Sequence, residues 1–159
     1  MSGPLGVAAS RTYPVPVDRA FDVVAPAPLP TIFRRRYGPL PPIRTVRDQT
    51  GGAWATGLGQ TRTIVLADRG TMREELVTLD RPHRFGYELT RITGPMAPLV
   101  ERVEGEWSFE PAGTGSRVTW SWVLHPRSGV TAPVVRLVAR WWKSYARQAL
   151  EEIEPLLVD

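Results

Sequence analysis

The chain has 159 residues, which suits one domain with a single sizeable core. Its 42% hydrophobic and 23% charged residues are typical of a soluble globular protein, and the lack of cysteine excludes disulfides and thiolate metal sites. The first ten residues lack the basic and apolar regions of a signal peptide, and no apolar run approaches the length of about twenty residues that a membrane span needs. We therefore expect a cytoplasmic protein with no membrane span.

The positive charge of the chain does not by itself indicate nucleic-acid binding. The net charge is +4, and nineteen of the twenty basic residues are arginine. Only residues 34–36 form a tight basic cluster, and the other basic residues alternate with acidic ones. Phosphate binding needs basic residues gathered on one face, so we favour an ordinary solvated surface over a nucleic-acid interface.

The N-terminal part of the chain predicts one strand and then two short helices, over residues 8–13, 17–24 and 29–35. Pro16 stands where a helix can start, and Phe21 lies on the apolar face of the first helix. Prolines at 39, 41 and 42 exclude a longer helix after the second one. Residues 1–7 are expected to be flexible.

The middle of the chain predicts six strands separated by turn residues, over residues 43–50, 60–67, 71–79, 85–92, 101–110 and 116–125. Short connections between successive strands indicate an antiparallel meander. Alternation is clearest in the last two strands, where Trp107 and Phe109, and then Trp120 and Trp122, share the apolar face. These aromatic side chains are expected to point inward.

The last part of the chain predicts one long amphipathic helix over residues 133–157, about 37 Å in length. We assign its buried stripe to apolar residues at three- and four-residue steps: Val134, Val138, Trp141, Tyr145, Ala149, Ile153 and Leu156. Trp142 is about 100° around the helix from Trp141, which places it at the edge of the stripe.

The order strand, two helices, six strands and long helix resembles the SRPBCC superfamily, which includes START domains, birch-pollen-allergen-like proteins and polyketide cyclase/dehydrase proteins. The segments that carry the resemblance are SRTYPVPVDRAFDVVA (10–25), LVTLDRPHRFGYEL (76–89) and EGEWSFEPAGTGSRVTWSW (104–122). The resemblance implies a single α+β domain over residues 1–159 with the helix-grip fold, a bent seven-stranded antiparallel sheet wrapped around the C-terminal helix. It also implies an apolar cavity between sheet and helix, which members use for lipids, sterols or polyketides.

Aromatic residues are the candidate ligand-binding set: Phe33, Tyr87, Trp107, Phe109, Trp120, Trp122, Trp141 and Tyr145. The alternative is that each fills the core, since aromatic side chains carry much of the burial in any core. We expect several to do both and to line a pocket of a few hundred Å³, with Tyr87 orienting the ligand. The proline-rich segment 26–42 is expected to form the entrance, and a large side chain at Gly105 to fill the pocket without disturbing the fold.

Catalytic groups are harder to find, and the catalytic residues remain unknown. His83 and His125 lack metal-ligand spacing, so no metal is expected, and no motif indicates a nucleophile or a bound cofactor. Glu74 and Glu75 are adjacent in a predicted strand, so only one of them can face inward. The sequence does not decide which.

Three functions remain open. We prefer a soluble binding protein for a hydrophobic lipid, polyketide or aromatic molecule, because the aromatic interior is visible while a catalytic constellation is not. The alternative is a cofactor-independent cyclase/dehydratase that uses the same cavity. The third hypothesis is a protein-interaction module, suggested by a basic stripe on the long helix: Arg136, Arg140, Lys143 and Arg147. A homodimer is also left open.

Overall fold

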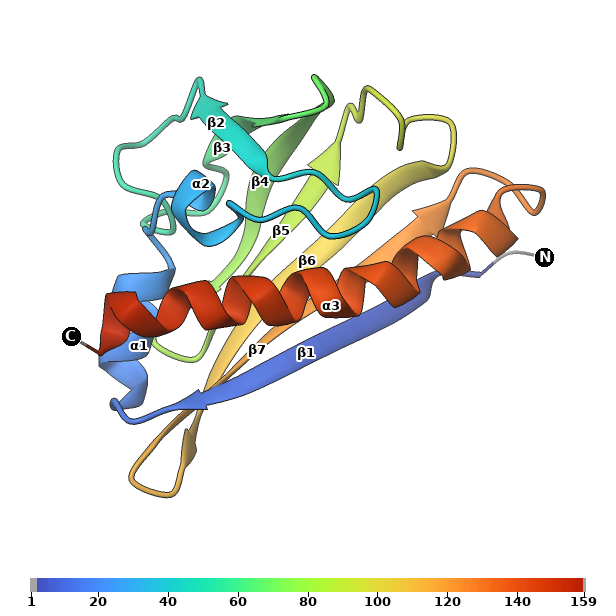
Figure 1. The fold of residues 1–159 in the computed structure, drawn as a ribbon. Helices are drawn as coiled ribbons and strands as arrows, with labels where there is room; N and C mark the ends of the chain where they lie inside the picture. Colours follow the sequence, from blue (N-terminus) through green and yellow to red (C-terminus); the bar gives the residue numbers. More distant parts are fainter. Residues whose placement is uncertain (1–2, 159) are drawn as a thin grey trace.

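Residues 3–158 are described by a computed structural model, which contains three helices and seven strands. Figure 1 shows a curved sheet with one long helix lying across its concave face. In chain order the elements are β1 Leu5–Tyr13, α1 Val17–Val24, α2 Leu29–Ile32, β2 Ile43–Arg47, β3 Thr61–Leu66, β4 Thr71–Asp80, β5 Arg84–Thr90, β6 Val100–Ala112, β7 Gly115–Pro126 and α3 Ala132–Leu157.

The seven strands form one antiparallel sheet in the order β1-β7-β6-β5-β4-β3-β2. Strands β2 to β7 pair with their neighbours in the chain, while β1 pairs with β7 at the opposite edge from β2. The chain therefore crosses the open side of the sheet between β1 and β2, and it carries α1 and α2 on the way (Figure 1). This arrangement confirms the predicted helix-grip fold.

Several element boundaries differ from the prediction, and β2, for example, ends at Arg47 instead of residue 50. Two further differences concern α2 and β1. Helix α2 stops at Ile32 instead of residue 35, because Phe33 leaves helical geometry with a ψ of 55° and its carbonyl accepts the backbone N–H of Ile43. Strand β1 begins at Leu5, three residues earlier than predicted. Residues 5–7 pair with β7, so they are strand rather than a flexible segment, and residues 1–2 lie outside the described part of the chain.

The predicted stripe of α3 is confirmed in part: Val138, Tyr145, Ala149 and Ile153 are buried, whereas Val134, Trp141 and Leu156 are not. Trp142 is 1% exposed, whereas Trp141 is only half-buried and Val134 is 44% exposed. The curved sheet reaches around the helix, so the buried face is wider than a single stripe and is shifted towards Trp142. Its members are Ala132, Val135, Val138, Ala139, Trp142, Tyr145, Ala146, Ala149, Leu150, Ile153 and Leu157.

Polar contacts fix the C-terminal half of α3 against both sides of the fold. The buried hydroxyl of Tyr13 in β1 donates a hydrogen bond to the carbonyl of Leu150, and Arg11 pairs with Glu154 at 2.9 Å. On the other side, Arg35 pairs with Glu151 and Glu152 at 2.6 and 3.1 Å. Within residues 3–158, no helix has the length and apolar character needed to cross a membrane.

The revised face of α3 predicts different costs for the two adjacent tryptophans. Trp142→Ala should lower the free energy of unfolding by about 3–5 kcal/mol, because it removes a fully buried indole from between helix and sheet. Trp141→Ala should cost about 1 kcal/mol, because that side chain is only half-buried. Urea unfolding of both variants measures this difference. Equal losses would show that the two side chains share the buried face.

Candidate functional site

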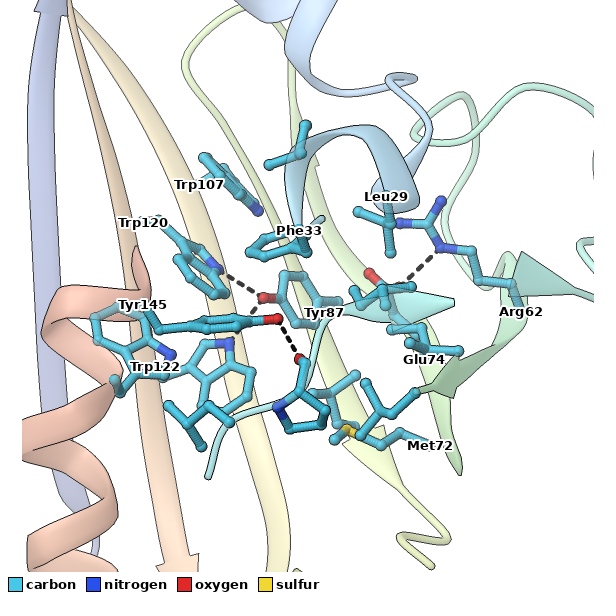
Figure 2. A pocket seen from close by; sticks show the side chains of 18 of the residues that line it. Leu29, Phe33, Arg62, Met72, Glu74, Tyr87, Trp107, Trp120, Trp122 and Tyr145 are labelled. Atoms are coloured by element: carbon cyan, nitrogen blue, oxygen red, sulfur yellow. Dashed lines mark hydrogen bonds and ion pairs between the residues drawn. The ribbon is translucent and has the colours of Figure 1, made fainter. Parts of the chain in front are cut away.

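A cavity of about 80 Å³ lies between the concave face of the sheet and α3. Figure 2 shows most of its wall, to which α1, α2, β2–β7, α3 and the segment between α2 and β2 contribute. Most of the lining is hydrocarbon or aromatic. The residues are Val24, Ala25, Leu29, Ile32, Phe33, Leu40, Pro41, Ile43, Arg62, Ile64, Leu66, Met72, Glu74, Phe85, Tyr87, Leu89, Met96, Trp107, Trp120, Trp122, Val138, Trp142 and Tyr145.

Six of the eight predicted site residues lie in this wall: Phe33, Tyr87, Trp107, Trp120, Trp122 and Tyr145. Phe109 does not, because its ring packs against Phe21, with 5.2 Å between the ring centroids. Trp141 does not either, because it lies on a half-exposed face of α3 and Trp142 takes its place in the wall. A role of the six residues in ligand binding remains a prediction.

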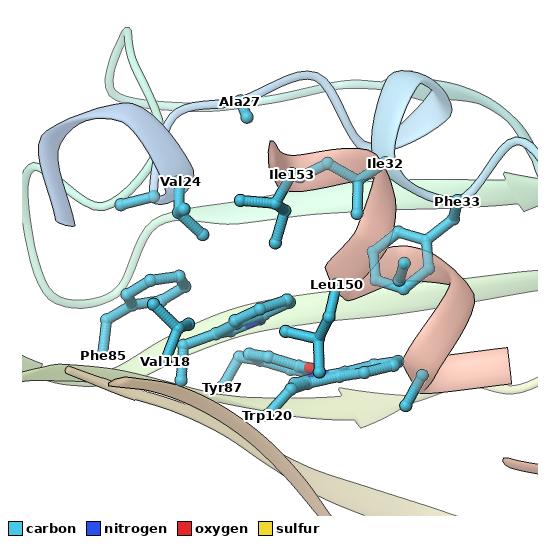
Figure 3. Close-up of a cluster of buried hydrophobic side chains, with 14 of the residues drawn as sticks. Val24, Ala27, Ile32, Phe33, Phe85, Tyr87, Val118, Trp120, Leu150 and Ile153 are labelled. Atoms are coloured by element: carbon cyan, nitrogen blue, oxygen red, sulfur yellow. The ribbon is translucent and has the colours of Figure 1, made fainter. Parts of the chain in front are cut away.

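The cavity is smaller than the few hundred Å³ expected from the sequence, because aromatic side chains fill much of the space. The indoles of Trp107 and Trp120 stack with 5.4 Å between centroids, and Trp142 lies 4.6 Å from Trp120. Figure 3 shows the adjoining cluster, in which Leu150 and Ile153 come from α3. The segment 26–42 supplies Leu29, Phe33 and Pro41 to the wall, and its role as an entrance remains a prediction.

Tyr87 is the polar centre of the aromatic wall. Its hydroxyl oxygen accepts hydrogen bonds from Nε1 of Trp120 at 2.8 Å and Nε1 of Trp122 at 2.9 Å (Figure 2). Burial raises the pKa of the Tyr87 hydroxyl well above its ordinary value, and the negative charge of Glu74 adds to the shift. Tyr87 therefore remains a neutral hydroxyl at any physiological pH.

Gly105 makes room for the ring of Tyr87. The two residues face each other across the β5–β6 pair, and a Cβ atom at position 105 would lie 2.1 Å from Cζ of Tyr87. No side chain fits there while the ring keeps its place. The expectation that a large residue at Gly105 would fill the pocket and leave the fold intact is therefore wrong, because it would first displace Tyr87.

Arg62 and Glu74 form a buried ion pair in the cavity wall. They face each other across the β3–β4 pair, with 2.8 Å between Arg62 Nε and Glu74 Oε1, and their side chains are 5% and 3% exposed. The guanidinium also lies over the Trp54 ring, 3.9 Å from its centroid. Burial raises the pKa of Glu74 above its ordinary value, and the charge of Arg62 opposes part of this shift.

This pair settles which of the two adjacent glutamates faces inward. Glu74 shares its face with Met72 and Leu76, both buried, whereas Glu75 lies on the outer face and pairs with Arg73 at 3.3 Å. Sequence reasoning missed Arg62 entirely. The available signal was an arginine in an alternating strand whose other inward positions, Ile64 and Leu66, are apolar.

Two other kinds of polar group bear on function, namely potential metal ligands and the basic residues of α3. Within residues 3–158, no group of three or more histidine, cysteine, aspartate or glutamate side chains could hold a metal ion. The basic residues of α3 are all exposed and lie away from the cavity: Arg136, Arg140, Lys143 and Arg147. Whether that stripe binds a protein partner remains a prediction.

Comparison with known families agrees with this architecture. Residues 4–157 match the model of a family described as polyketide cyclase / dehydrase and lipid transport. The chain belongs to this family, and the predicted membership of the SRPBCC superfamily is confirmed. No curated protein matches the chain.

Solved structures with a similar fold come from proteins of low sequence identity. Ara h 8.0201 is 16% identical with a TM-score of 0.72, and the match covers 98% of this chain and 99% of that one. The major latex-like protein 151 of Panax ginseng is 13% identical, with the same TM-score of 0.72 and the same coverage of 98% and 99%. A protein from Nitrosospira multiformis is 15% identical with a TM-score of 0.65, over 98% and 97% of the two chains. At these identities the likeness concerns the fold.

The inner and outer glutamates of β4 offer a matched test of the buried ion pair. Glu74→Gln should lower the free energy of unfolding by about 3–5 kcal/mol, because it leaves the charge of Arg62 buried without a counter-charge. Glu75→Gln, which disrupts the exposed pair with Arg73, should cost less than about 1 kcal/mol.

Urea unfolding at neutral pH gives both values. The double variant Arg62→Met/Glu74→Leu should recover much of the loss, because no unpaired charge remains in the apolar wall. A small and equal cost for the two glutamine variants would show that the buried pair contributes no more than the exposed one.

Proposed function

We propose that this protein binds a small hydrophobic molecule in the cavity between the sheet and α3. The observation that carries the proposal is an unfilled space with an almost wholly apolar and aromatic wall beside the hydrophobic core. A ligand with apolar surface would gain from leaving water for such a site, and a few placed polar groups would orient it. The description of the family, which includes lipid transport, supports the same function.

The size of the cavity limits the ligand. A space of about 80 Å³ suits a small, compact molecule better than a long or branched lipid. The stacked indoles of Trp107 and Trp120 offer flat surfaces, and ring faces prefer such offset contacts. We therefore place small aromatic or alicyclic compounds first among the candidates.

The cytoplasmic location and a homodimer remain predictions from the sequence.

A second candidate function is a cyclase or dehydratase without a cofactor. Glu74 favours it, because a buried carboxyl group with a raised pKa in a cavity wall is the kind of group that transfers protons in enzymes. Neutral Tyr87 lies in the same wall.

Native mass spectrometry of freshly purified protein, followed by incubation with polyketone probes, distinguishes the two functions. Loss of one water from a probe favours the enzyme, and an unchanged probe favours binding.

Binding is tested with matched substitutions on α3. Small aromatic probes of one or two rings should bind in the micromolar range and quench tryptophan fluorescence, because four tryptophans line the cavity: Trp107, Trp120, Trp122 and Trp142. Val138→Phe adds volume inside the cavity and should abolish saturable quenching. Val134→Phe makes the same change one turn earlier at an exposed position and should leave quenching intact.

Circular dichroism of both variants controls for folding. The binding proposal fails if no probe of the panel gives saturable quenching with the unmodified protein. It also fails if Val138→Phe and Val134→Phe reduce the quenching equally, because the probe would then bind outside the cavity.

A further inference from the structure

The three buried tyrosines differ in the use of their hydroxyl protons. Tyr13 donates to the carbonyl of Leu150, and Tyr145 donates to the carbonyl of Pro41 at 2.9 Å. Tyr87, only 6% exposed, accepts two hydrogen bonds and donates none to any group in residues 3–158. Among these three tyrosines, the one in the centre of the aromatic wall therefore has its proton free.

Because the two indoles already donate to the Tyr87 oxygen, the hydroxyl can only act as a donor towards any further group. An indole Nε1–H is only a donor, whereas a tyrosine hydroxyl has one proton and can accept two hydrogen bonds. Both accepting positions of Tyr87 are occupied by Trp120 and Trp122. The proton must therefore find its acceptor elsewhere, and leaving a buried donor unpaired costs free energy.

The two indole bonds also increase the strength of the remaining donor. Hydrogen bonds that a hydroxyl accepts polarise its O–H bond, and the effect is larger inside a protein than in water. Because burial raises the pKa of Tyr87, the proton is retained. Tyr87 is thus a fixed, polarised O–H donor in an apolar cavity.

We propose that the ligand of this cavity is an uncharged carbonyl compound whose oxygen accepts the hydrogen bond of Tyr87. This inference rests on the proposed function and adds the chemical class of the ligand. The lack of charge follows from the wall, where the two charged residues, Arg62 and Glu74, already neutralise each other. A ligand charge would be buried without a partner, at a large cost in free energy.

The matched probes 1-indanone and indane test the inference, because they share a compact bicyclic skeleton and differ by one carbonyl group. Isothermal titration calorimetry with the full chain should give about tenfold tighter binding of 1-indanone. Any water on Tyr87 is displaced by both probes, and only the ketone replaces its hydrogen bond. Indane-1-carboxylate, which is charged, should bind more weakly than 1-indanone.

Two phenylalanine variants assign the effect to one hydroxyl. Tyr87→Phe should bring the affinity ratio of the two probes close to one, because the donor is gone. Tyr145→Phe should leave the ratio near tenfold, because the hydroxyl of Tyr145 is already bonded to Pro41. Both residues line the cavity, so the pair controls for loss of a hydroxyl from its wall.

A second measurement does not depend on any variant. The infrared carbonyl stretch of 1-indanone bound to the unmodified protein should lie at lower wavenumber than in hexane, as expected for an accepted hydrogen bond. An unshifted band overturns the inference even if Tyr87→Phe fails to fold. Tighter binding of indane-1-carboxylate than of 1-indanone overturns the uncharged class.

The remaining outcomes separate this inference from the proposed function. Equal binding of indane and 1-indanone overturns the role of Tyr87 and leaves hydrophobic binding intact. Failure of both probes and of the aromatic panel overturns the two together.

Discussion

The contact of Trp142 with the indoles of Trp120 and Trp122 joins the long helix to the sheet, and the interior depends on it. Ring centroids of Trp142 lie 4.6 and 5.8 Å from those two partners. This contact holds α3 at a distance set by large tilted rings, not by small aliphatic side chains. Space therefore remains beside these rings, towards β3, β4 and α2, where shorter side chains such as Leu29 and Ile64 line the cavity. The cavity is a consequence of how the aromatic residues are distributed.

Polar groups survive in this interior because each is held by a partner from another strand of the sheet. Arg62 and Glu74 belong to β3 and β4, and Tyr87 on β5 meets indoles on β7. A sheet places such partners at fixed spacing, so desolvation is offset by hydrogen bonds that need little side-chain ordering. The result is an apolar wall with a small number of oriented dipoles, which is the usual composition of a small-molecule site.

Much of the fold could be predicted from the sequence because its signals are local. Alternating apolar and polar residues in 101–125, and glycine and proline in the turns between strands, are enough to place the strands. A helical period of apolar residues over 133–157 is enough to place α3. The buried face of α3 could not be fixed in the same way. Trp141 and Trp142 differ by about 100° of rotation, and only the curvature of the sheet decides between them.

The candidate site was harder to predict because it depends on register. The sequence shows that one of Glu74 and Glu75 points inward, but the partner Arg62 becomes visible only when β3 and β4 are aligned. The size of the cavity depends on side-chain packing, and local patterns do not contain it. Six aromatic residues of the wall were found because aromatic residues on inward faces are a local signal, whereas Phe109 packs on a separate aromatic cluster with Phe21 and Phe85.

The absence of a side chain at Gly105 ties two positions on different strands into one unit. The ring of Tyr87 occupies the volume that any Cβ at position 105 would need, so the two positions cannot change independently. A relative with a larger residue at the position of Gly105 must carry something smaller than tyrosine opposite it. Such a chain would keep the sheet and the helix, but it would lack the tyrosine hydroxyl that could bind the oxygen of a ligand. Covariation of this pair among relatives would therefore divide the family into members with a polar cavity centre and members with a wholly apolar one.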